Sequence, residues 1–113
     1  MAEQENPFKV VYALIWKSHE PDEVFNPQDF DDRIPRLMTW LKDVHKKGKL
    51  VACGGGGFEN HTGGLTLITA DNIEDAIAIS EGSPMNEIGT TEILMWDVFY
   101  GSLDEKSHIQ KLS

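Results

Sequence analysis

The chain has 113 residues, which is enough for one domain; we expect a single domain over 1–113, with its core at about 8–100 and a polar tail at 101–113. A composition with 40% hydrophobic and 26% charged residues is typical of a globular protein and not of a disordered one. The net charge of −9 argues against nucleic acid or an anionic membrane as a partner.

The first predicted element is a strand at 8–16, a run rich in Val, Ile, Tyr and Trp. Residues at alternate positions are apolar on both sides of this strand, so we expect both of its faces to be covered. A chain of this length has enough helix for one face only. The other face is therefore expected to meet a second subunit.

A polar loop is expected at 17–29, followed by a helix at about 31–47. Apolar residues within 34–44 recur at spacings of three and four, which is the period of an amphipathic helix. Pro35 fits the first turn, where its missing N–H costs least. Gly48 is a natural residue for the end of this helix.

Four further elements complete the predicted fold. We expect a short strand at 49–53, a loop at 54–63 and another strand at 64–70. Asp71 is predicted to cap a second helix that runs to about Glu81, with Glu74 completing a capping box. A last strand is expected at 92–100, again apolar on both faces.

The predicted order is β-α-β-β-α-β, which is the ferredoxin-like arrangement of the α+β class. In this fold a four-stranded antiparallel sheet carries two helices on one face. We expect the uncovered face to be buried in a homodimer, in which two sheets stack against each other.

The longest apolar run, 10–16, is far shorter than the roughly 20 residues of a membrane helix, so no membrane partner is expected. The first residues, 1–6, have neither a basic nor an apolar segment, and we expect no signal peptide. Cys53 is the single cysteine, which excludes an internal disulfide and fits a reducing compartment. A cytoplasmic location is therefore expected.

Several short motifs resemble the YCII-related domain family: Arg33–Leu41 (RIPRLMTWL), Gly48–Gly54 (GKLVACG), Gly63–Ile68 (GGLTLI), Ile73–Ala76 (IEDA) and Ser83-Pro84. The resemblance covers roughly residues 8–100. It implies a dimeric α/β barrel with a cleft in each subunit. Members are proposed to be small enzymes, and muconolactone isomerase has a similar fold.

The sequence departs from the family at two positions. Members usually carry a histidine just before the leucine matched by Leu37, and an aspartate just before the proline matched by Pro84. These two residues are the family's suspected acid–base pair. Arg36 and Ser83 stand at the matching positions here. The resemblance therefore carries over the fold but not the activity.

Arg33 and Arg36 share one face at the start of the predicted helix, where positive charge opposes the helix dipole. A small anionic ligand would relieve this repulsion, and six of the ten basic residues of this acidic chain lie between 33 and 52. The alternative is a pair of ordinary ion pairs, Asp29 with Arg33 and Asp32 with Arg36, at the favoured spacing of four.

Glycines 54–57 lead into a strand and not into a helix, so we interpret them as a flexible hairpin loop with positive φ angles and not as a phosphate loop. The alternative interpretation is that this loop borders the cleft. His61 is a weak candidate for an acid–base group, against the alternative of an exposed histidine without a role. Cys53 is expected to be a small buried hydrophobic residue.

The four histidines and the cysteine show no metal-ligand spacing, and we expect no metal and no cofactor. Tyr12, Trp16, Trp40 and Trp96 are expected in the core or the dimer interface, with a ligand pocket as the alternative.

These observations leave two functions open. The first is a homodimer that binds a small, anionic organic molecule through Arg36, Arg33 and Ser83, and that acts as a cofactor-free isomerase or lyase if it is an enzyme. The second is a non-catalytic binding or assembly protein that has lost the family's His/Asp pair.

Overall fold

The computed structural model describes residues 9–102. Its elements are, in chain order, β1 (Lys9–Ser18), α1 (Pro27–Asp31), α2 (Ile34–Lys46), β2 (Leu50–Phe58), β3 (His61–Ile68), α3 (Ile73–Ser80), the short 3-10 helix η1 (Pro84–Glu87) and β4 (Gly89–Val98). No helix within this part of the chain is long and apolar enough to cross a membrane.

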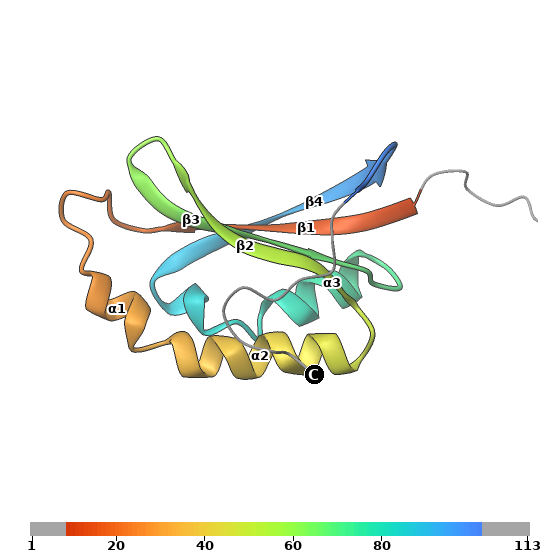
Figure 1. The fold of residues 1–113 in the computed structure, drawn as a ribbon, viewed down its shortest axis with the longest axis horizontal. Helices are drawn as coiled ribbons and strands as arrows, with labels where there is room; N and C mark the ends of the chain where they lie inside the picture. Colours follow the sequence, from red (N-terminus) through yellow and green to blue (C-terminus); the bar gives the residue numbers. More distant parts are fainter. Residues whose placement is uncertain (1–8, 103–113) are drawn as a thin grey trace, which may run out of the picture.

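The four strands form one antiparallel sheet in the order β2-β3-β1-β4. The helices lie on one side of the sheet, with α2 running along it (Figure 1). This is the expected ferredoxin-like α+β architecture. The central strand β1 has a neighbour along each edge, so its backbone polar groups are paired inside the sheet, as a buried strand requires.

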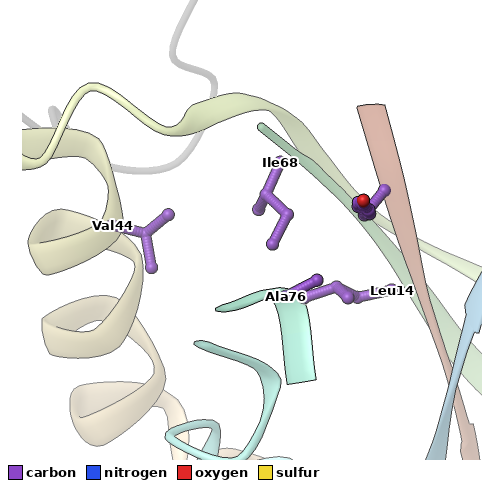
Figure 2. Close-up of a cluster of buried hydrophobic side chains, with 5 residues drawn as sticks. Leu14, Val44, Ile68 and Ala76 are labelled. Atoms are coloured by element: carbon purple, nitrogen blue, oxygen red, sulfur yellow. The ribbon is translucent and has the colours of Figure 1, made fainter. Parts of the chain in front are cut away.

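The hydrophobic core lies between the sheet and the two longer helices. Leu14 of β1, Ile68 of β3, Val44 of α2 and Ala76 of α3 meet there, together with Tyr12 (Figure 2). Ile68 and Ala76 have no exposed surface. The predicted stripe on the long helix therefore points at the sheet, as its period indicated.

The long predicted helix at 31–47 is interrupted near its start. The chain forms α1 up to Asp31 and begins again at Ile34 with α2. Pro35 accounts for the break, because its nitrogen cannot donate to the carbonyl of Asp31. Pro35 lies in the first turn of α2 and Gly48 follows its end with φ of 74°, as predicted.

The prediction of a loop at 54–63 was wrong. Glycines 54–57 belong to β2 and pair in register with β3, and only Glu59 and Asn60 form the turn. The φ angles of glycines 54–57 are not positive; Gly48 has the positive φ among the described glycines, and Glu59 in the turn has φ of 53°. Strand pairing uses backbone groups alone, so a run without side chains can extend a ladder although it shows no alternating pattern.

The predicted cap of the second helix was displaced by one residue. Asn72 is the N-cap of α3, and its side-chain oxygen accepts from the backbone N–H of Asp75 at 2.8 Å. Asp71 instead donates its backbone N–H to the carboxylate of Asp75 at 3.1 Å. Asp75 is held further by Lys49, whose ammonium lies 2.7 Å away. Both Asp and Asn are good caps, and the ion pair with Lys49 favours the register with Asn72.

Candidate functional site

A cavity of about 760 Å³ lies between α2 and the helix-covered side of the sheet. One side is formed by apolar residues of α2, among them Leu37, Met38 and Leu41. The other side is formed by Leu14 of β1 and by the hairpin of β2 and β3. Its size is within the range of sites that hold a small organic molecule.

Aromatic rings line the cavity from both sides: Trp40 of α2 and Phe30 of α1 from the helices, and Trp16 of β1 from the sheet. Trp16 donates its indole N–H to the carbonyl of Met85 at 2.8 Å, and Trp40 donates to the carbonyl of Ile79 at 3.0 Å. Because both indoles are bonded to backbone, their rings are held in one orientation before any ligand arrives. Two of the four aromatics considered above thus line a pocket.

Glycines of β2 and β3 form much of the sheet side of the cavity. Gly54, Gly55, Gly56, Gly63 and Gly64 all contribute to it. Gly55 is in register with Gly64 and Trp16, so a Cβ atom there would point to the helix side; its nearest heavy atom would be 4.0 Å away, so local packing does not require glycine at this position. The glycines leave an open face of bare backbone that a ligand can approach closely.

Gly63 and Gly89 are glycines for a local reason. A Cβ at Gly63 would overlap the Phe58 ring and lie 2.9 Å from the carbonyl oxygen of Trp16. A Cβ at Gly89 would overlap the Trp16 indole. These two positions let the chain pass close to Trp16, and so they help to place this indole at the cavity.

Most polar side chains of the lining already have partners. The hydroxyls of Thr62, Ser80 and Thr91 donate to Asp22, to the carbonyl of Ile77 and to Asn86. Ser83 caps η1: its hydroxyl oxygen accepts from the backbone N–H of Met85 at 3.2 Å, which leaves its proton free to donate. Of the predicted ligand-binding residues, Ser83 is the one that lies on the cavity.

Cys53 and Thr66 are register partners in β2 and β3, and both line the cavity. Cys53 was expected to be buried; it is exposed, because β2 is an edge strand beside an open cavity. Partial desolvation raises the pKa of its thiol, so the neutral form dominates near pH 7. No side-chain hydrogen bond of Thr66 to another described residue is present, so its hydroxyl can both donate and accept.

Arg33 and Arg36 do not belong to the lining; both bind Glu87 of η1. Arg36 makes a two-pronged contact, with its nitrogens 2.9 and 2.8 Å from the carboxylate oxygens, and Nε of Arg33 lies 3.0 Å away. The two guanidiniums lower the pKa of Glu87 from 4.5 to about 2, chiefly through the hydrogen bonds of Arg36. The same carboxylate raises the pKa of Arg36.

The alternative of two ion pairs at the helix start, Asp29 with Arg33 and Asp32 with Arg36, is therefore wrong in its acidic partners. Arg33 donates to the backbone carbonyl of Asp29 at 2.8 Å, and Asp32 accepts from Gln28 at 2.7 Å. Both oxygens of Glu87 accept from the Arg36 fork, and such two-pronged contacts between a guanidinium and a carboxylate are among the strong ones. The resulting clasp of Arg33, Arg36 and Glu87 joins the first turn of α2 to η1, next to the cavity residues Leu37 and Met85.

His61 begins β3 beside the cavity residue Thr62, but it is not itself part of the lining. Within residues 9–102, no three His, Cys, Asp or Glu side chains gather in a way that could hold a metal ion. Sequence reasoning missed Thr66 and Glu87 as residues of this region. Glu87 has no local signal, since it is 51 residues from Arg36; Thr66, a polar residue inside an apolar strand, could have been noticed.

Comparison with known proteins supports the fold and leaves the site to be argued from its own geometry. No curated protein and no solved structure gives a significant match. The family described as the YCII-related domain matches residues 11–97, which run from the third residue of β1 to the last residue but one of β4. Because this match spans most of the chain and includes parts of all four strands, the protein belongs to the YCII-related domain family.

Proposed function

We propose that this protein binds a small organic molecule in the cavity between α2 and the sheet, and that it does so as a homodimer. The observation that carries the binding function is the cavity itself: about 760 Å³, open to solvent, and lined by two indoles held in place and by the bare backbone of the β2–β3 hairpin. A core without a ligand-binding role would normally be filled with side chains.

Binding has better support than acid–base catalysis. Within residues 9–102, the cavity lining contains no carboxylate, imidazole, ammonium or guanidinium. Arg36 and Ser83, at the positions of the family's suspected pair, provide an ion-paired guanidinium and a capping hydroxyl. Neither group exchanges protons near pH 7. Of the two functions expected above, we therefore favour the non-catalytic binding protein, and Ser83 is a proposed ligand contact.

The binding function can be tested by filling the cavity with one side chain. Gly55 is the register partner of Gly64, and Gly64 pairs with Trp16, so a side chain at position 55 points toward the helices. Gly55→Val is expected to block the cavity, since the nearest atom to its Cβ, the carbonyl oxygen of Gly63, is 4.0 Å away. Gly54→Val is the matched control, because the alternation of the strand directs it to the opposite face.

Titration calorimetry would measure the binding of three bicyclic probes: naphthol, naphthoate and decalol. We expect at least one probe to bind the parent protein and the Gly54→Val variant but not Gly55→Val. Equal affinity of every bound probe for both variants would place binding elsewhere. If none of the three probes binds the parent protein, the cavity is not a binding site for molecules of this size and the proposal is wrong.

The homodimer is proposed from the helix-free face of the sheet. Leu65, Leu94 and Trp96 stand on this face and are 43%, 53% and 41% exposed, although they are large and apolar. They surround Ala13, which is buried. An apolar surface of this kind on a sheet is typical of a protein interface. A second copy of the chain would cover it with the same surface.

Substitutions at two neighbouring residues of β4 distinguish a loss of the dimer interface from a general loss of stability. Leu94 is the partner of Ala13 and points to the helix-free face, whereas Met95 is the partner of Tyr12 and points to the helix side. Both are exposed, by 53% and 62%. In sedimentation experiments we expect Leu94→Lys to be a monomer and Met95→Lys to remain a dimer. A parent protein that sediments at 12.7 kDa would contradict the homodimer.

A further inference from the structure

We propose that the cavity selects a neutral, flat aromatic molecule that carries one hydroxyl or carbonyl group, and that Thr66 binds this group. The inference rests on the proposed binding function and adds the chemical class of the ligand. It replaces the small anionic ligand expected from the two arginines.

The charge of the lining favours a neutral ligand. The cavity lining within residues 9–102 carries no charged side chain, and the nearest cations considered, Arg33 and Arg36, are held by Glu87. An anion that entered this cavity would lose water without gaining a positive partner, which is costly. A neutral molecule avoids this loss.

The shape and chemistry of the two sides favour a flat ring. Phe30 and Trp40 present aromatic surfaces on the helix side, where Met38 adds a polarisable sulfur, and Trp16 of β1 adds a third ring from the sheet. On the sheet side, Gly55 and the residues around it present peptide groups without side chains. A flat ring can contact both surfaces over its whole area, whereas a thick saturated ring contacts them at a few atoms only.

Two hydroxyls of the lining remain available to a ligand: that of Ser83, whose oxygen already accepts from Met85, and that of Thr66, which has no side-chain partner among the described residues. The indole N–H groups of Trp16 and Trp40 donate to the carbonyls of Met85 and Ile79, so they are not available to a ligand. Thr66 has a hydroxyl that can donate and accept, and it stands on the sheet between Leu14 and Cys53 in register. It therefore matches either a hydroxyl or a carbonyl.

The three probes named above separate charge from shape. Naphthol is flat and neutral, naphthoate is flat and anionic, and decalol is neutral but saturated. At pH 7 we expect naphthol to bind the parent protein at least about ten times more tightly than either of the others, a difference of about 1.4 kcal/mol. Tighter binding of naphthoate would overturn the neutral class and leave the binding function intact; equal binding of decalol would overturn the flat class.

The role of Thr66 has its own test. Thr66→Val keeps the shape of the side chain and removes the hydroxyl, and should weaken naphthol binding about five-fold, as the loss of one hydrogen bond does. Methylnaphthalene, which has no polar group, should bind both proteins equally, and Thr66→Ser should restore naphthol binding. A Thr66→Val variant that weakens the two probes alike would show that Thr66 acts through the shape of the cavity only, and would refute its assigned role.

Discussion

Gly56 and Gly63 are register partners in the hairpin of β2 and β3, yet they should respond in opposite ways to the addition of one methyl group. A Cβ at Gly56 meets nothing within 4 Å, and its φ is not positive, so alanine fits without strain. Gly56→Ala should stabilise the protein by about 0.5–1 kcal/mol, because alanine loses less backbone entropy on folding. A Cβ at Gly63 lies 2.9 Å from the carbonyl oxygen of Trp16, and backbone cannot move aside easily.

Gly63→Ala should therefore cost about 1–3 kcal/mol, the usual range for overpacking a tight site. Thermal unfolding followed by circular dichroism would measure both variants at one pH and one protein concentration. A change of 1 kcal/mol corresponds to about 4 °C in a domain of this size. Equal destabilisation by the two substitutions would refute the reasoning, since it would mean that Gly56 also faces a closely packed neighbour, in the second subunit or elsewhere.

The remaining predictions concern a helix cap and the clasp beside the cavity. Asn72→Ala should lower the free energy of unfolding, measured by urea denaturation, by about 1 kcal/mol, because the helix loses its cap. Asp71→Ala should leave this free energy almost unchanged, since the side chain of Asp71 is not the cap. A larger loss for Asp71→Ala than for Asn72→Ala would show that Asp71 is the cap. Glu87 has a pKa of about 2 in the folded protein against 4.5 ordinarily, so the stability that its charge contributes is fully present above pH 4.5 and is lost as the pH falls through about 2. Glu87→Gln should be less stable than the parent at pH 6 and should lose less stability on acidification; parallel pH profiles of the melting temperature would show that the clasp contributes nothing measurable.

The sequence predicted the fold better than the site. Strands β1 and β4 were found from their two apolar faces, and α2 from the spacing of Leu41 and Val44, because side chains repeat with the period of the backbone. The resemblance to the YCII-related family agreed with the observed match over residues 11–97. The site was harder, because a cavity depends on the space that several elements leave between them.

Local patterns by themselves determined which elements form and which of their faces are apolar, since both follow from residues a few positions apart. They also placed the helix end at Gly48, where the backbone adopts φ of 74°. Only the tertiary structure decided that the glycine run extends β2, since glycine has no side chain with which to show a period. Likewise, only the tertiary structure joined Arg36 to Glu87 and left open space beside Trp16 and Thr66, because these arrangements depend on how distant segments pack and not on either segment alone.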